Sequence, residues 1–117
     1  MIMNGREIKF KRTVMATCII ADRCPEGDIQ RAAELFNGDY RSRMENGAIF
    51  AVALNDGYER NRAFEEPGYK PHPLTVDEVM LLDFEDYEKL IEEATTAFAA
   101  EMPTIETAPS KKNTASK

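Results

Sequence analysis

The chain has 117 residues, of which 43% are hydrophobic and 31% charged, a composition typical of one globular domain rather than of a disordered chain or a fibre. The formal net charge of −6 argues against binding to nucleic acid, and no apolar run approaches the roughly 20 residues that a membrane-spanning helix needs. Residues 1–10 mix charged and apolar residues, unlike a secretory signal, so the sequence predicts a cytoplasmic protein with neither nucleic acid nor a membrane as its partner.

The first ten residues predict a β-hairpin. Asn4-Gly5 is the strongest short signal for a hairpin turn, because both central residues of a type I′ turn need positive φ. After the turn, Ile8 and Phe10 alternate with charged residues, which is typical of a strand with one buried face. Because an isolated hairpin is only marginally stable in water, we expect this apolar face to pack on another part of the chain.

Two helices are predicted next. Thr13 can cap a helix that runs to about Cys24, where Pro25 ends it because the residue before a proline disfavours helix. Its predicted apolar stripe consists of Val14, Met15, Cys18 and Ile19. Asp28 can cap a second helix, which ends at Asn37-Gly38. Its stripe, at positions i, i+3, i+4 and i+7, consists of Ile29, Ala32, Ala33 and Phe36.

Residues 48–54 are all apolar, and such a run is compatible with either a helix or a buried strand. Three of these residues are alanines, and polar flanks extend the segment beyond the usual length of a strand, so a helix is favoured. Asp39 can cap this helix, and we expect Gly47 and Gly57 to weaken its ends.

Residues 65–74 hold three prolines and a glycine, and they predict a loop. Thr75 and Glu78 then have the form of a capping box, which opens a short helix that buries Val76, Val79 and Met80. The last predicted helix runs from about Phe84 to Glu101. Its apolar stripe consists of Tyr87, Leu90, Ile91, Ala94, Ala97 and Phe98.

The predicted fold is therefore mainly α: a small N-terminal β-hairpin packed on a compact bundle of about five helices. We assign residues 1–102 to a single helical domain. Residues 103–117 are small, polar and aperiodic. We expect them to form a disordered, flexible tail, because they cannot bury enough apolar surface to offset the entropy lost on ordering.

Negative charge is concentrated near the C-terminal end of the predicted domain. Residues 1–70 hold 11 basic and 11 acidic residues, whereas residues 71–102 hold one basic and nine acidic residues, a net charge of −8. An acidic face of this density can steer a basic partner towards the protein. It is also the pattern of a solvated helix face that maintains solubility, and both interpretations stay open.

Side chains suited to catalysis or cofactor binding are few. His72, the only histidine, lies between two prolines without a neighbouring nucleophile, and Cys18 is predicted to be a small core residue. Arg23 can lower the pKa of the Cys24 thiol, but no histidine accompanies that cysteine. The acids among residues 83–88 lack the glycine of a calcium loop, and the six glycines are isolated rather than grouped around a phosphate site. The sequence therefore predicts no enzyme, no cofactor and no metal site.

The order of the predicted parts is distinctive. A hairpin and compact helices precede a loop, then the helix start Leu74-Thr75-Val76-Asp77-Glu78-Val79, an acidic amphipathic helix and a polar tail with lysines. Over residues 1–102 this layout resembles the tail assembly chaperones of long-tailed bacteriophages and related prophage elements. The resemblance implies a non-enzymatic protein of the bacterial host cytoplasm that coats the tape measure protein before the tail tube assembles around it.

The resemblance also implies a second, longer form of the protein, made by ribosomal frameshifting near the end of the short reading frame. The extra domain of that form recruits tail tube subunits. Lys111-Lys112-Asn113 is compatible with the slippery codons of such a frameshift, and also with an ordinary polar tail.

Candidate partner-binding residues for this function are of two kinds. Apolar side chains are candidates to line client-binding grooves, with plain core packing as the alternative for each: Phe36, Phe50, Leu54 and Tyr58. Acidic side chains are candidates to repel premature self-assembly or to attract a basic partner: Asp83, Glu85, Glu88 and Glu92. We expect such a protein to self-associate and to gain avidity from many weak sites along one client.

Two other functions are compatible with parts of the sequence. The acidic stretch 71–102 is compatible with an acidic inhibitor or decoy that binds a basic DNA-binding protein. Residues 28–38 resemble the start of a helix-turn-helix regulator, but Arg41 and Arg43 are followed by an apolar run, which favours a core over a DNA groove.

Overall fold

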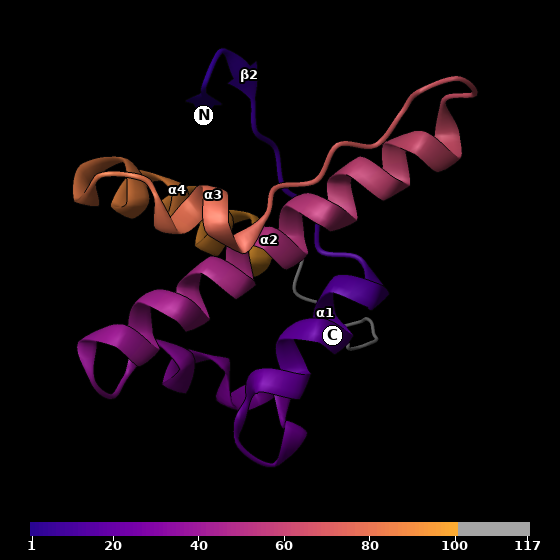
Figure 1. Cartoon of the computed structure of the whole chain (residues 1–117). Helices are drawn as coiled ribbons and strands as arrows, with labels where there is room; N and C mark the ends of the chain where they lie inside the picture. Colours follow the sequence, from indigo (N-terminus) through magenta and orange to yellow (C-terminus); the bar gives the residue numbers. More distant parts are fainter. Residues whose placement is uncertain (101–117) are drawn as a thin grey trace.

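The computed structural model describes residues 1–100 as a mainly helical chain with an N-terminal β-hairpin, as the sequence predicted (Figure 1). Its two strands and its α-helices and 3₁₀ helices (η) follow one another as β1 (Ile2–Met3), β2 (Arg6–Glu7), α1 (Val14–Arg23), η1 (Pro25–Gly27), η2 (Ile29–Phe36), α2 (Tyr40–Glu65), α3 (Val76–Met80) and α4 (Phe84–Ala100). The predicted tail, residues 103–117, lies outside the described residues.

Helix α2 is the axis of the fold. Helices α1, η2, α3 and α4 all contact it, with α3 and α4 on one side and α1 on the other in Figure 1. The apolar run 48–54 lies in the middle of α2, which confirms a helix rather than a buried strand. The Asp39 carboxylate accepts a hydrogen bond from the Ser42 N–H and caps the helix, as predicted.

Two glycines allow other parts of the chain to approach the α2 backbone closely. A Cβ atom at Gly47 would lie 2.2 Å from the Tyr87 hydroxyl oxygen of α4, and one at Gly57 would lie 2.6 Å from the Lys11 carbonyl oxygen. The glycines were expected near the ends of this helix, but α2 continues through both of them, so both lie in its interior. Their small size is used for close packing.

The buried face of α1 differs from the predicted stripe. Ala16 and Ile20 are buried in the α-helix, and Cys24 is buried just after it. Val14 and Met15 are exposed. Cys18 is also exposed, so its prediction as a core residue was wrong. Ile19, also in the predicted stripe, is partly buried against the core. The face differs because the fully buried residues form a narrow row spaced four apart, which includes the small Ala16 and not the bulkier Val14 and Met15.

The second predicted helix is a 3₁₀ helix, η2, capped by Asp28 as expected. A 3₁₀ helix has three residues per turn, so buried positions recur every third residue rather than at α-helical spacing. Ala32 and Leu35 are accordingly buried, and Ile29 is partly buried. Ala33, which the predicted stripe included, is exposed.

The hairpin and its Asn4-Gly5 turn are as predicted, but the second strand ends at Glu7, so Ile8 and Phe10 lie after the strand and not within it. Asn4 and Gly5 have φ values of +52° and +80°, and Ile2 pairs with Glu7 and Met3 with Arg6 in the antiparallel register. After the hairpin, Ile8 is 1% exposed and joins the core.

Two buried polar side chains of α2 hold the irregular segments of the chain. The Asn55 amide donates to the Lys9 carbonyl at 2.9 Å and accepts from the Leu74 N–H at 2.7 Å. One carboxylate oxygen of Glu59 accepts from the Tyr69 hydroxyl at 2.6 Å and from the His72 N–H at 2.9 Å. These contacts satisfy backbone groups that no helix or strand pairs.

The C-terminal helices are close to their predictions. Thr75 and Glu78 form the expected capping box of α3. Val79 is fully buried and Val76 packs partly buried against the core, as predicted. Met80 is 41% exposed, contrary to prediction, because it is the last residue of α3 and faces a cavity beside α2. In α4 the predicted stripe faces the core, and its most buried members are Tyr87, Leu90 and Ala94.

The close approach at Gly47 can be tested by a double-mutant cycle. We expect Gly47→Ala to lower the free energy of unfolding by about 1–3 kcal/mol, because its methyl group overlaps the Tyr87 hydroxyl. In a Tyr87→Phe background the same change should be much less harmful, since the nearest remaining atoms lie 3.2–3.3 Å away. Chemical denaturation of the four proteins measures this coupling.

Gly57→Ala is the matched control for this cycle. The atom that it overlaps is the backbone oxygen of Lys11, so Tyr87→Phe should give no rescue. Equal losses from Gly47→Ala in both backgrounds would contradict the proposed contact.

The N-terminal amine provides a pH test of the hairpin's attachment. The Met1 amine donates to Glu7 at 2.9 Å, to the Ile8 carbonyl at 3.2 Å and to Glu93 of α4 at 3.0 Å. Burial of the amine opposes its charge, but the hydrogen bonds that it donates to both carboxylates, with their negative charge, outweigh that effect and raise its pKa above the ordinary 8.0. These contacts therefore stabilise the fold fully below that pH, and the contribution is lost as the pH rises through the raised pKa.

We expect Glu93→Gln to cost about 0.5 kcal/mol of stability at about pH 7, and less at about pH 10, where a larger share of the amine has lost its proton. Urea denaturation at the two pH values measures the difference. A loss that is the same at both would show that the ion pair does not contribute.

Candidate partner-binding surface

Several large apolar side chains are exposed on this protein, and some of them lie close together. Tyr40, at the start of α2, is 59% exposed; Met80, at the end of α3, is 41% exposed; and Phe84, at the start of α4, is 53% exposed. All three line one cavity. Leu81, which follows Met80 in the chain, is 86% exposed. A cluster of this kind on a protein surface is typical of a contact surface.

Two adjoining cavities lie between the first turns of α2 and helices α3 and α4. The larger, of about 620 Å³, is lined by Phe36, Arg43, Met44, Phe84, Glu85, Tyr87, Glu88, Lys89, Ile91 and Glu92. The smaller, of about 370 Å³, is lined by Tyr40, Arg41, Met44, Glu45, Val79, Met80, Leu82, Phe84 and Tyr87. Because Met44, Phe84 and Tyr87 line both cavities, we treat the two as one feature, the α2–α4 groove.

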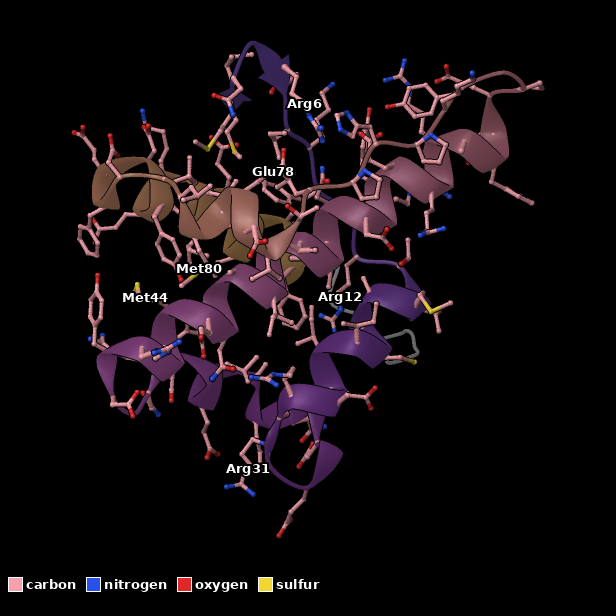
Figure 2. The ribbon with its side chains drawn as sticks, in the orientation of Figure 1. Arg6, Arg12, Arg31, Met44, Glu78 and Met80 are labelled. Carbon is pink, nitrogen blue, oxygen red and sulfur yellow. The ribbon has the colours of Figure 1, made fainter. Side chains whose placement is uncertain are left out.

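Figure 2 shows how the walls of the α2–α4 groove meet. Met44 projects from α2 and Met80 from α3, and the two side chains lie near one another in this view. Methionine is flexible and polarisable, so it adapts to apolar surfaces of different shapes. The groove therefore has an adaptable apolar wall.

Local interactions hold the groove in place. The Tyr87 hydroxyl donates to the Met44 carbonyl at 2.9 Å and fixes α4 against α2 at the Gly47 crossing. Burial raises the pKa of the Tyr87 hydroxyl, with a further contribution from Tyr40, so this donor keeps its proton at neutral pH. The Asp83 carboxylate accepts from the Asp86 N–H at 2.9 Å and caps α4, which places Phe84 in its first turn.

Charge is distributed unevenly around the groove. Glu85, Glu88 and Glu92 lie along the α4 side and are exposed, and none of them forms an ion pair within residues 1–100. On the α2 side, the Arg43 guanidinium lies 5.7 Å from the centre of the Tyr40 ring. The Arg43 Nε is buried and has no hydrogen-bond acceptor among the described residues.

The structure separates the residues that the sequence offered as partner-binding candidates. Phe36, Glu85, Glu88 and Glu92 line the larger cavity together. Asp83 is exposed beside it, as the cap of α4.

The remaining apolar candidates do not lie on the groove. Phe50 is 2% exposed, with its ring between Phe36 and Phe98 at centroid distances of 5.4 and 5.2 Å, and Leu54 is fully buried. Tyr58 is partly buried on the C-terminal half of α2 and lines neither cavity. For Phe50 and Leu54, core packing is therefore the correct alternative.

Sequence reasoning missed Tyr40, Met44, Met80 and Phe84 as surface residues. Phe84, Tyr87 and Ile91 recur at i, i+3 and i+7, which marks them as one helix face, but the same spacing also marks a core face. Only the structure shows that Phe84 is half-exposed and lines the groove, while Tyr87 is buried.

The chemically reactive side chains lie elsewhere. Burial raises the pKa of the Cys24 thiol, as do the nearby acids Asp28 and Glu34, so the prediction of a lowered pKa was wrong. His72 lies against Arg6 of the hairpin, whose guanidinium is 2.8 Å from the imidazole Nδ1. Within residues 1–100, no three His, Cys, Asp or Glu side chains are grouped as metal ligands, and no helix is long and apolar enough to cross a membrane.

Comparison with known proteins does not assign the chain to a family: no family model matches it, and no curated protein and no solved structure is significantly similar to it.

The distinction between core and groove predicts losses of stability of very different size for two apolar residues. Leu54→Ala should lower the free energy of unfolding by about 2–5 kcal/mol, because it leaves a cavity in the core. Phe84→Ser should cost less than about 1 kcal/mol, since half of its ring is already in water. Thermal and urea denaturation measure both, and a large loss from Phe84→Ser would show that this residue belongs to the core.

Proposed function

We propose that this protein is a non-enzymatic tail assembly chaperone of a long-tailed bacteriophage or prophage, which works in the host cytoplasm. In this proposal it binds the tape measure protein through the α2–α4 groove and assists assembly of the tail tube. The observation that carries the proposal is the apolar groove itself, whose residues Tyr40, Met80 and Phe84 are exposed on a small helical domain. The layout of the chain, from hairpin to acidic helix, supports the same function.

The physical demands of this task match the groove. A long helical client must be covered along its length so that its apolar faces do not aggregate before the tube forms. Helix-in-groove docking covers such faces, because side chains spaced at i, i+3 and i+7 enter an apolar groove together. One groove of this size gives a weak contact, but many copies on one client gain by avidity.

Co-expression tests the proposal. We expect the wild-type chain to keep the long helical protein encoded beside it soluble and to co-purify with it. Phe84→Ser should abolish the complex, because it removes an exposed ring from the groove without disturbing the core.

Phe64→Ser is the matched control. Phe64 is 88% exposed but lies near the C-terminal end of α2, away from the groove, so this variant should bind as the wild type does. A client that stays insoluble and unbound with the wild-type chain would refute the proposed function. A client that binds Phe84→Ser as tightly as the wild type would show that the α2–α4 groove is not the binding site.

An acidic inhibitor or decoy is the second candidate function. It is favoured by the exposed Glu85, Glu88 and Glu92, which form no ion pair within the described residues. Such a protein would bind a basic DNA-binding partner tightly and in a strongly salt-dependent way. Replacing the three acids by glutamine would then abolish binding, whereas Phe84→Ser would leave it unchanged.

A further inference from the structure

The α2–α4 groove has walls of side chains and offers no strand edge. Its two sides come from α2 and from α3 and α4, while the only described strands belong to the N-terminal hairpin. A partner that enters the groove must therefore bring its own paired backbone, since Met44, Phe84 and Tyr87 between the two cavities offer mainly apolar contact. An α-helix meets this condition because its backbone hydrogen bonds are internal.

The charge along one edge restricts the sequence of that helix. Glu85, Glu88 and Glu92 stand at i, i+3 and i+7 on α4, so they form one row beside the larger cavity. Within residues 1–100 none of the three forms an ion pair, and they outnumber Lys89, the one basic residue that α4 contributes to the same cavity. Like charges at this spacing repel one another. A helix with Lys or Arg at the same spacing would neutralise the whole row.

The α2 side of the groove carries positive charge instead. Arg43 of α2 lines the larger cavity, with its guanidinium 5.7 Å from the centre of the Tyr40 ring. Its positive charge favours a neutral or acidic side chain of the bound helix on this side. The two edges of the groove thus differ in the side chains that they accept.

From these observations we propose that the α2–α4 groove is specific for a basic amphipathic α-helix. The apolar face of the helix enters between Met44, Met80 and Phe84, and its Lys or Arg residues lie over the acidic row of α4. The inference rests on the proposed function, for which it names the chemistry of the client segment. It excludes acidic helices of equal apolar character, which would meet the glutamate row with like charge.

Three synthetic helical peptides test this specificity with the full chain. Two have the same apolar face and differ only in flanking residues, which are lysine in one and glutamate in the other. The third keeps the lysines but replaces the apolar face by serine. Fluorescence anisotropy should show the basic amphipathic peptide binding at least about 10-fold more tightly than the acidic one. It should show no binding of the serine peptide.

Two charge variants of the protein test whether the acidic row of α4 causes the preference for the lysine peptide. In the triple variant Glu85→Gln, Glu88→Gln, Glu92→Gln, the preference for lysine should fall below about 3-fold, because the acidic row is gone. The variant Asp22→Asn, Glu26→Gln, Glu65→Gln changes net charge equally on exposed sites outside the groove and should keep the preference. Raising the salt concentration should reduce the preference in the wild type.

Other outcomes would overturn the inference. Equal binding of the basic and acidic peptides would remove the role of the acidic row, and binding of the serine peptide would indicate charge attraction without a groove. If neither amphipathic peptide binds, or if sedimentation shows a dimer that Phe84→Ser dissociates, the occupant is not a basic helix. Co-purification of the client in the co-expression experiment would stand in each case, so failure of this inference is distinguishable from failure of the proposed function.

Discussion

The architecture depends on a constraint placed on one helix: α2 must allow close approach at two points along its backbone. Gly47 admits the Tyr87 hydroxyl of α4, and Gly57 admits the carbonyl of Lys11. Each glycine costs about 0.5–1 kcal/mol of helix propensity relative to alanine, so the packing that it permits must contribute more. The crossing at Gly47 also sets the groove, because it fixes Tyr87 on Met44 and so places Phe84 beside the start of α2.

In its C-terminal half, α2 holds neighbouring segments through two buried polar side chains as well as through a glycine. Asn55 and Glu59 bind the Lys9 carbonyl and the N–H groups of Leu74 and His72, so the connecting segments need no regular structure of their own. A buried amide or carboxylate is tolerated here because each bonds to groups that would otherwise be unsatisfied. Helices α1, η2, α3 and α4 pack around α2 and complete the core. The α2–α4 groove lies at the N-terminal end of α2, opposite to the hydrogen bonds of Asn55 and Glu59.

Local chemistry is what made parts of this fold predictable. The turn at Asn4-Gly5 and the caps at Asp39 and Thr75 depend on neighbours within a few residues, and the structure has all of them. The identity of the buried face was predictable only where one stripe dominated, as in α4. It was not predictable in α1, where the packed row begins with the small Ala16, since hydrophobicity alone favours its larger neighbours.

The candidate site was predictable only in part, for the same reason. Phe36 and Phe50 were equal candidates for groove or core, and only tertiary packing makes Phe50 a core residue and leaves Phe36 partly buried in the lining of the larger cavity. Glutamates at helical spacing mark an exposed face from sequence alone, so the acidic row was identified before its position beside a cavity was known.

The acidic row also bears on how the free protein avoids covering its own groove. An exposed apolar groove invites a second copy to bind, and the simplest dimer would pair the two grooves face to face about a two-fold axis. Such an arrangement brings Glu85, Glu88 and Glu92 of one copy towards the same residues of the other, where like charges oppose contact. The residues that favour a basic helix therefore disfavour this dimer.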